Sequence, residues 1–467
     1  MNMKKVLFIA ALGIIAASAS SCRDDFFGQY PSNNITEGNF YQTESDFNQG
    51  VYSCYAKLKT ESGFFISELG YRSDESYLES MAVSTQDRYD LDHFAENASN
   101  GILRDVWNAW YNGIYRCNDV LDHMLTTSLD TQSEKMKQYK GECLFIRSWY
   151  NINLYKTFGV VPLINKVVSP TEAMTIPRCT DQGMLERLKE DLTEAIELLP
   201  EKRPAEKARV SKIAARALLG QVYLTFKMYP EAKKVLADAL SDAGYGLMEN
   251  TAAAFNVTNK MNKEIIFALC YNKGNDFGHG YWWSSNTNVE ADRHVPTVPT
   301  KSLFDTEKDN RWPLIHDFIK ITSSVYAMPK WYDTYDATYT TQVGNDYPLL
   351  RYADVVLMYA EALGLGGDIA GALPYINQTR TRAGLNPLTS AEVASEAAFR
   401  QQLADERGRE FAYEGKRWFD LVRLGLAVDY FTKLGYKIDN HELVLPIPQN
   451  QIEIYNNNAV LWQNPGY

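Results

Sequence analysis

Three glutamates near the C-terminus are spaced so that their carboxylates share one face of a helix. Glu406, Glu410 and Glu414 stand four residues apart, and like charges at this spacing repel by roughly a few tenths of a kcal/mol. Paired carboxylates hydrolyse glycosidic bonds when they face a cleft. Three acids on one helix that is also rich in arginine instead favour a structural ion-pair network. The candidate cationic partners are Arg380, Arg382, Arg407, Arg409, Arg417 and Arg423.

Two segments, residues 70–101 and 271–347, mix aromatic with polar side chains and interrupt the helical order of the chain. The apolar C–H faces of a sugar ring stack on flat aromatic rings, and the sugar hydroxyls need polar partners, so this mixture predicts a sugar-binding surface on loops. The candidates in the second segment are Tyr281, Trp282, Trp283, Trp331 and Tyr332. The candidates in the first segment are Tyr71, Arg72, Asp74, Tyr77, Tyr89 and Asn100.

Several of these candidates also have a structural interpretation. Trp282 and Trp283 are adjacent, and outside a regular helix adjacent side chains diverge, so at most one of them is expected in the core. Trp331 is compatible with a packed strand residue as well as with a ligand contact. Arg72 and Asp74 are equally compatible with a structural ion pair.

Motifs for other chemistry are absent from the sequence. The six histidines show neither HExxH nor HxH spacing, and no GxSxG, P-loop or Rossmann glycine pattern occurs. Asp90 and Asp92 alternate as in a calcium loop, but the glycine and the distant glutamate of such a loop are missing. Calcium therefore stays possible but unsupported, and we expect no catalytic residues, no metal site and no cofactor.

The N-terminus has the features of a secretory signal. Lys4 and Lys5 precede an apolar run at residues 6–17, and three small residues lead to Cys22. This run is too short and wrongly flanked for a membrane-spanning helix. A cysteine directly after the small residues indicates a lipobox, in which residues 1–21 are removed and Cys22 is acylated, although Ala19 stands where leucine is usual. A plain signal peptide cleaved nearby is the alternative.

Composition limits the ligands and the mode of membrane attachment. Without Lys4 and Lys5 the chain carries 45 basic and 58 acidic side chains, a formal charge of −13. An acidic chain without a basic stripe cannot neutralise phosphates, which argues against nucleic acid. No other segment is long and apolar enough to span a bilayer, so a lipid on Cys22 is the expected anchor. The remaining five cysteines form no CxxC pair, and we expect no disulfide framework.

Helical periodicity dominates the rest of the chain and predicts three helix pairs, at about residues 107–158, 185–240 and 350–382. The clearest repeat is in the second pair, where Gly220 and Leu236 belong to the small and large spacing of a tetratricopeptide (TPR) repeat. Stacked pairs of this kind build an α-solenoid. The predicted fold is therefore dominated by α-helix, with a TPR-like scaffold packed against a loop-rich half. No Pro/Gly/Ser linker divides residues 22–467, which favours a single domain.

A family resemblance covers nearly the whole mature chain. The residues at 405–423, the Leu445-Pro446-Ile447-Pro448 run and the closing residues 463–467 resemble the signature of the SusD/RagB family. Each motif is weak singly, but their order over more than 400 residues is specific. The other matching positions are Cys22 to Phe27 with Pro31, Trp107, Tyr111, Ile114, Asn118, Glu142, Arg147, Tyr150, Phe158 to Leu163, Arg351 to Asp354, Met358 to Ala362, Asn377, Arg380 and Arg382 to Leu385.

The resemblance implies a nutrient-binding lipoprotein of the bacterial outer membrane. Such a protein captures an oligosaccharide at the cell surface and works with a SusC-like TonB-dependent transporter. The acidic residues after Cys22 resemble the tag that sends these lipoproteins to the cell surface. Two other functions remain open from sequence: capture of peptides, as in the RagB branch, and, less favoured, an all-helical glycoside hydrolase.

Overall fold

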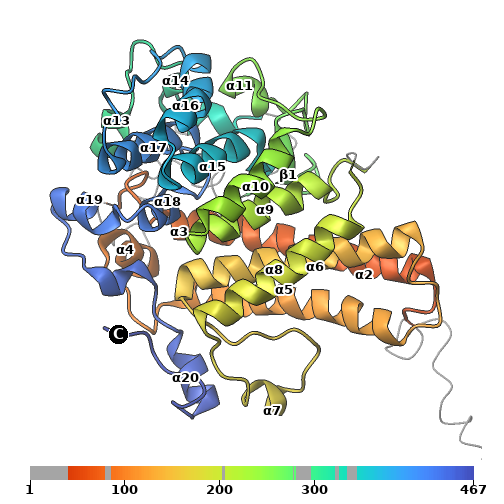
Figure 1. Ribbon diagram of the computed structural model, residues 1–467. Helices are drawn as coiled ribbons and strands as arrows, with labels where there is room; N and C mark the ends of the chain where they lie inside the picture. The colour runs from red at the N-terminus through yellow and green to blue at the C-terminus, as the bar shows by residue number, and fades with distance from the viewer. Residues whose placement is uncertain are drawn as a thin grey trace, which may run out of the picture.

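A computed structural model of the chain describes residues 40–78, 86–201, 206–276, 278–279, 296–320, 326–333 and 344–467. In Figure 1 a lower layer of long helices packs against an upper group of shorter ones. The lower layer contains α2 (Glu44–Lys57), α5 (Gly101–Thr126), α6 (Glu134–Phe158) and α8 (Asp181–Leu198). The upper group contains α9 (Lys212–Thr225), α10 (Tyr229–Leu240), α15 (Tyr352–Leu365), α16 (Ile369–Arg382) and α17 (Glu396–Glu410).

Consecutive long helices pack against one another, as the predicted pairs require. The chain of contacts runs from α5 to α6, α8, α9 and α10, continues to α15 and ends at α16. Gly220 of α9 shows why small residues stand in these helices, because a Cβ there would lie 2.4 Å from the Leu236 side chain of α10. The helix-rich TPR-like scaffold predicted from the sequence is therefore confirmed.

Polar caps fix where the long helices begin. The side chains of Asn100, Ser133 and Thr180 accept backbone N–H groups in the first turns of α5, α6 and α8. These bonds satisfy donors that have no partner inside the helix. At its other end α6 stops at Gly159, which has a φ of 73°, a backbone conformation that side chains with a Cβ rarely adopt.

The loop-rich half surrounds the upper group with short elements. A two-stranded antiparallel sheet joins β1 (Ile265–Leu269) to β4 (Tyr347–Arg351), and a smaller one joins β2 (Ile319–Lys320) to β3 (Tyr326–Ala327). The short helices before residue 340 are η2 (Leu58–Ser62), α3 (Gly63–Gly70), α4 (Gln86–His93), α7 (Pro170–Ala173), α11 (Thr251–Ala254), α13 (Val298–Leu303), α14 (Trp312–His316) and η3 (Pro329–Trp331). Those near the C-terminus are α18 (Arg417–Arg423), α19 (Ala427–Lys433), η4 (Asn440–Leu443) and α20 (Gln449–Tyr455).

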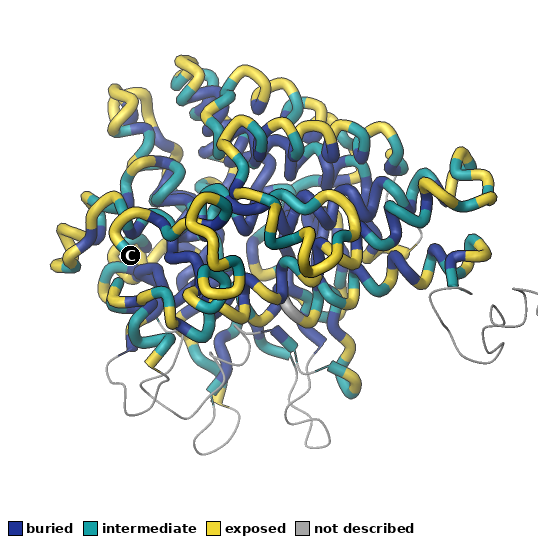
Figure 2. Tube along the Cα trace, turned by 90° about the horizontal axis from the view of Figure 1, so that it is seen from below, coloured by how far each residue is buried: buried dark blue, intermediate teal, exposed yellow. Residues whose placement is uncertain are grey.

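Two apolar cores hold these layers together. The larger one extends from α2 through α5, α6, α8 and α9 to β1 and β4, and the smaller one lies among α15, α16, α17, α18 and α19. Figure 2 shows the buried segments at the centre of the molecule and the exposed ones on its outer turns. None of the helices described here combines the length and apolar composition needed to cross a bilayer. The five cysteines in the described residues are free thiols.

The acidic face of α17 is fully buried in an ion-pair network. Glu410 binds Arg351 (2.6 Å), Arg311 (3.0 Å) and Arg382. Glu414, just beyond the helix, binds Arg351 (3.0 Å) and Lys330 (2.7 Å). The side chains of Glu410, Glu414 and Arg351 are all 0% exposed. The interpretation of these glutamates as a structural ion-pair network is therefore confirmed. The three carboxylates do not share one helix, however, because α17 ends at Glu410 and Glu414 lies in the turn that follows.

The expected arginines supply only part of this network. Arg380, Arg382 and Arg409 pair with the acidic face as predicted. Three others were wrongly assigned, because their guanidinium groups reach different carboxylates: Arg407 pairs with Asp420, Arg417 with Asp74, and Arg423 with Glu361 and Asp420. Among the partners that the sequence did not indicate are Arg311, directly before α14, Lys330 of η3, and Arg351 at the end of β4.

Opposing effects act on the carboxylates of this network. Burial by itself raises the pKa of Glu414, but the charges of Arg351, Lys330 and Lys416 outweigh burial and lower that pKa to about 2. The pKa of Glu410 is also held well below its usual range, since Arg382, Arg351 and Arg311 outweigh the effect of burial. Both groups therefore stay ionised at neutral pH, and neither can act as a proton-donating acid there.

We expect Glu410→Ala to lower the free energy of unfolding by about 3–5 kcal/mol, because it removes the carboxylate that Arg311, Arg351 and Arg382 share and leaves these buried cations with too few negative partners. Urea unfolding followed by circular dichroism measures the loss. The matched control is Glu396→Ala on the same helix, whose pair with Arg400 is largely exposed and should contribute less than about 1 kcal/mol. Equal stability of the two variants would contradict a structural role for the buried network.

Candidate functional site

The two aromatic-rich segments meet at the backbone of Asp74. The hydroxyls of Thr297 and Thr300, at the start of α13, both donate hydrogen bonds to the Asp74 carbonyl oxygen, the second at 2.6 Å. These residues are separated by more than two hundred positions in the chain. The fold therefore brings the segments at 70–101 and 271–347 to a common region, and their described residues can be compared as parts of one surface.

Arg72 and Asp74 hold this region together from inside instead of facing a ligand. Asp74 pairs with Arg417 (2.9 Å) and is itself buried. Arg72 pairs with Glu96 and donates to the carbonyl oxygen of Glu442 (2.7 Å). As each side chain is at most 5% exposed, the interpretation of both residues as ligand contacts is corrected to a structural one.

Arg72 also lies between two aromatic rings, which explains how a charged side chain is tolerated so deep. Its guanidinium carbon is 4.7 Å from the ring centroid of Phe94 and 4.8 Å from that of Trp418. Such cation–π contacts strengthen when water is excluded. The C-terminal helix α18 is thereby fixed to the segment that leads into α4.

Tyr71 and Asn100 are likewise structural. Tyr71 is 1% exposed, with Arg88 positioned 5.9 Å from its ring centroid. Asn100 caps α5: its Oδ1 accepts the N–H groups of Ile102 (3.0 Å) and Leu103 (3.2 Å). Its amide also donates to the carbonyl oxygen of Asp87. The ring of Tyr71 and the amide of Asn100 thus contact other parts of the protein, and the prediction of both residues as ligand contacts is corrected.

Tyr77 lies at the surface, Tyr89 is half-buried against the core, and both rings contact His93. Tyr77 is 48% exposed. The Tyr89 and His93 rings stack at a centroid distance of 3.9 Å with an interplanar angle of 16°, and Tyr77 is 5.8 Å from the same imidazole. We call these three residues the α4 aromatic surface. Sequence reasoning missed His93, although its position four residues after Tyr89 places both on one helix face.

Buried polar groups support the α4 aromatic surface from below. Arg88 binds Glu68 through two hydrogen bonds of 2.7 and 2.9 Å, which ties α4 to α3. Asp92 accepts the Leu78 N–H (3.0 Å), and burial raises the pKa of its carboxyl to about 7. Nδ1 of His93 lies 3.3 Å from Asp92 and 2.9 Å from the carbonyl oxygen of Tyr89. The imidazole is therefore held in one orientation beside the tyrosines.

Asp90 and Asp92, which alternate as in a calcium loop, bind different partners in the structure. Asp90 accepts a hydrogen bond from Gln86, and Asp92 accepts one from Leu78, so the two aspartates use separate partners. Within the described residues, one group has the donor types and closeness that a metal ion requires, namely Asp439, His441 and Glu442. These side chains bond to one another and cap η4.

The remaining aromatic candidates differ in what the structure says of them. Trp331 is buried, because Phe255 (5.1 Å) and His279 (4.6 Å) pack edge-on against its ring, so its prediction as a ligand contact is corrected. Tyr332 is half-buried. Tyr281, Trp282 and Trp283 lie outside the described residues, as does Cys22.

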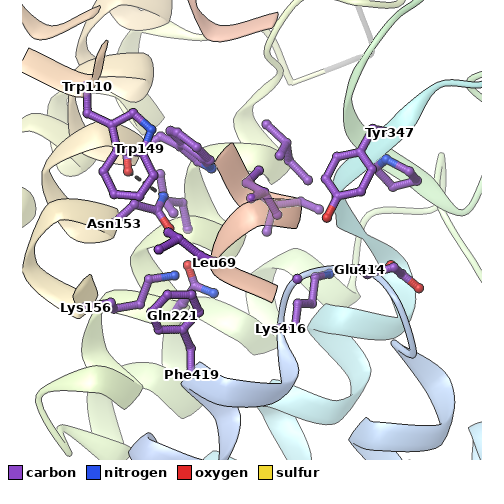
Figure 3. A pocket seen from close by; sticks show the side chains of 16 residues that line it. Leu69, Trp110, Trp149, Asn153, Lys156, Gln221, Tyr347, Glu414, Lys416 and Phe419 are labelled. Atoms are coloured by element: carbon purple, nitrogen blue, oxygen red, sulfur yellow. Dashed lines mark hydrogen bonds and ion pairs between the residues drawn. The ribbon is translucent and has the colours of Figure 1, made fainter. Parts of the chain in front are cut away.

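A pocket between the two layers is lined by aromatic rings but is too small for a sugar. Figure 3 shows Trp110 and Trp149 on one side and Tyr347 on the other, with Lys156 and Phe419 below. The cavity measures about 60 Å³, which accommodates a few water molecules. Trp110 and Trp149 are both buried and belong to the larger apolar core.

Comparison with known proteins identifies similar chains. The family described as "SusD family" matches residues 316–444, and the one described as "Starch-binding associating with outer membrane" matches residues 32–224. SusD-like protein P2 of Formosa agariphila is 25% identical over the full length of both chains. Starch-binding protein SusD of Bacteroides thetaiotaomicron is 36% identical over 28% of this chain and 23% of its own.

A solved structure shares the fold at lower identity. Surface glycan-binding protein A from Bacteroides thetaiotaomicron, in complex with laminarihexaose, superposes with a TM-score of 0.73 at 21% identity. The superposition covers 90% of this chain and 99% of that protein. This likeness establishes the common fold.

We expect Asn100→Ala to lower the free energy of unfolding by about 1 kcal/mol, the usual cost of a lost N-cap. Asn100→Asp keeps the carbonyl-type acceptor and should lose less. Asn108→Ala, an exposed asparagine on the same helix, serves as the control and should change stability by less than about 0.5 kcal/mol. Thermal unfolding by calorimetry measures all three variants, and an unchanged Asn100→Ala would contradict the capping role.

Proposed function

The chain belongs to the SusD family, and from this premise we propose that it binds an oligosaccharide at the bacterial cell surface through the α4 aromatic surface. The observation that carries the proposal is the cluster of Tyr77, Tyr89 and His93, in which Tyr77 is exposed and the other two rings are half-buried and stacked on each other. Flat rings held rigidly lose little entropy when a sugar ring stacks on them. The relatives named for starch and laminarihexaose point to the same ligand class.

The proposed site extends into the second aromatic-rich segment. Tyr281, Trp282 and Trp283 are proposed to add stacking rings, because Thr297, a short distance along the chain, is bonded to Asp74 beside the first segment. Tyr332 is a further proposed contact. The observation that supports this extension is the meeting of the two segments at Asp74.

Binding without bond cleavage fits the described carboxylates. A glycoside hydrolase needs one carboxylic acid and one carboxylate facing the scissile bond. Glu406, Glu410 and Glu414 are instead 0% exposed at their side chains and paired with cations. We propose that this helix supports the fold and that the protein is a binding protein and no enzyme.

We further propose that the protein is an outer-membrane lipoprotein that delivers its ligand to a SusC-like TonB-dependent transporter. The name of the family matched at residues 32–224, associating with the outer membrane, supports the location. Residues 1–21 are proposed as the lipoprotein signal peptide and residues 22–467 as the mature domain. The lipid is proposed on Cys22, directly after the small residues of the leader.

We expect Tyr77→Ala and Tyr89→Ala each to weaken oligosaccharide binding by about 1–2 kcal/mol, since each removes a stacking ring and its buried area. Isothermal titration with maltohexaose and laminarihexaose measures affinities that should lie between micromolar and millimolar, about −8 to −4 kcal/mol. Trp282→Ala and Trp283→Ala enter the same series, with at least one expected to weaken binding. Tyr115→Ala, an exposed tyrosine on α5, is the control.

Two results would argue against this proposal. Full affinity in the Tyr77, Tyr89, Trp282 and Trp283 variants would place the glycan site elsewhere. Saturable binding of peptides, with no binding across a panel of neutral and acidic oligosaccharides, would assign the protein to the peptide-capturing branch instead.

We expect Cys22→Ala to abolish lipid attachment, because the thiol is the group that is acylated. The variant should either leave the membrane fraction or accumulate as uncleaved precursor. Fractionation of cells and metabolic labelling with a fatty-acid analogue measure both outcomes. Normal processing together with unchanged membrane retention would contradict the lipid anchor.

A further inference from the structure

A second cavity lies between the two layers, away from the α4 aromatic surface. It measures about 360 Å³, within the range of small-molecule sites. The ends of α6 and α9, the start of α8 and the helices α17 and α18 supply its walls. The residues that line it are Tyr155, Lys156, Gly159, Asp181, Thr225, Lys227, Arg400, Phe419, Val422, Arg423, Gly425, Leu443 and Val444.

Cations predominate among the side chains around this cavity. Lys156, Lys227, Arg400 and Arg423 face a single acid, Asp181. Arg423 is already paired with Glu361 and Asp420, and Arg400 with Glu396. Asp181 accepts a hydrogen bond from Tyr155 (2.8 Å). Among the described residues, no carboxylate lies within ion-pair distance of Lys156 or Lys227, and the nearby charge of Asp420 acts on Lys156 only from farther away.

Lys156 differs from the other lysines that lie over aromatic rings. Its Nζ is 4.9 Å from the ring centroid of Phe419. Lys59, Lys330 and Lys416 make similar ring contacts, and each also binds a carboxylate. In the described part of the chain, Lys156 is thus a partly buried ammonium with a ring contact and no anion.

The surroundings of Lys156 favour the arrival of an anion. Burial lowers the pKa of its ammonium, the charges of Arg423, Lys416 and Arg407 lower it as well, and Asp420 acts in the opposite direction, so that the pKa falls to about 7. The pKa is depressed because the charged form is poorly solvated and repelled by these cations. An anion bound beside Nζ offsets both effects with its own charge and so favours the charged form.

We propose that this cavity binds a small organic carboxylate, whose negative group pairs with Lys156 while its body packs against Phe419 and the apolar wall. Val422, Leu443 and Val444 form that wall. Lys227, at the exposed rim, and Arg400 add positive charge on the approach to the cavity. Two classes of ligand fit these contacts equally, acidic sugars and aromatic acids, because both combine a carboxylate with a six-membered ring.

Small molecules of known charge test the site and distinguish an acidic sugar from an aromatic acid as its ligand. Saturation-transfer and chemical-shift titrations use D-glucuronate with D-glucose as its neutral counterpart, and benzoate with benzyl alcohol as its neutral counterpart. At least one acid should bind saturably to the full mature protein, and its neutral counterpart at least tenfold more weakly. Glucuronate alone identifies an acidic-sugar site, and benzoate alone an aromatic-acid site.

Variants on α6 then assign the binding to Lys156. Lys156→Met should weaken binding of the acid at least tenfold, and Lys156→Arg should restore most of it. Lys135→Met, at an exposed lysine on the same helix, is the control and should bind as the wild type does. The Met side chain replaces a partly buried charge with an apolar group of similar length, so the melting temperature should not fall.

A pH series supplies a readout that a merely structural role would not move. Binding of the acid should weaken from pH 6 to pH 8.5 in the wild type, because Lys156 loses its charge in that interval, and the Lys156→Arg variant should keep its affinity. No described lining residue is a histidine, the side chain that ordinarily titrates near neutral pH. The other charged groups around Lys156 include two aspartates and three arginines, namely Asp181, Asp420, Arg400, Arg407 and Arg423.

Two results would overturn the proposal. One is the absence of saturable binding of either acid up to about 20 mM. The other is equal affinity of the wild type and Lys156→Met. Neither outcome bears on the α4 aromatic surface, whose variant Tyr77→Ala should bind the acids normally.

Discussion

The rest of the structure depends on the buried guanidinium of Arg351. It is fully enclosed and binds three carboxylates from two distant parts of the chain, namely Glu264 directly before β1 and Glu410 and Glu414 at the end of α17 and just beyond it. Arg351 ends β4 and directly precedes α15, so one side chain sets the position of the small sheet, the TPR-like helices and the acidic end of α17. A guanidinium suits this role, because its planar fork of donors satisfies several carboxylates at once.

This network is connected to the candidate glycan surface through the chain that follows α17, one further ion pair and two hydrogen bonds. Beyond α17 the chain enters α18, where Arg417 binds Asp74. The carbonyl group of Asp74 in turn receives the Thr297 and Thr300 hydroxyls. Exposed rings can bind a ligand with little loss of entropy only when their support is rigid. The buried charges at the centre and the tyrosines of the α4 aromatic surface are thus joined by a continuous set of contacts.

The sequence predicts the helical scaffold well because its signals are local. The Gly220 and Leu236 spacing reports a contact between neighbouring helices, and the α17 glutamates report a shared face through their separation alone. The partner of that face could not be predicted in the same way. Arg351 and Arg311 lie about 59 and 99 positions from Glu410, and no periodicity connects residues so far apart.

The candidate site residues were chosen by residue type. Their burial, which the sequence does not report, divides them into structural residues and possible ligand contacts. Tyr71 and Tyr77 are six positions apart and chemically identical, yet one is in the core and the other is half exposed. Asp74, Arg72 and Asn100 are polar because the loop must satisfy its own buried donors and acceptors. A polar residue beside an aromatic one therefore indicates a ligand contact only after its structural partners have been identified.

Arg72 and Lys156 are two cations that lie against aromatic rings, and they differ in whether the protein supplies a negative partner. Arg72 lies between Phe94 and Trp418 and also binds Glu96, so its charge is fully compensated inside the protein. Lys156 has the ring of Phe419 but no described carboxylate within ion-pair distance. A buried charge that the fold leaves uncompensated lowers stability, and a bound anion from solution removes that cost. The difference between these two cations is therefore the physical basis for expecting a ligand at Lys156 and none at Arg72.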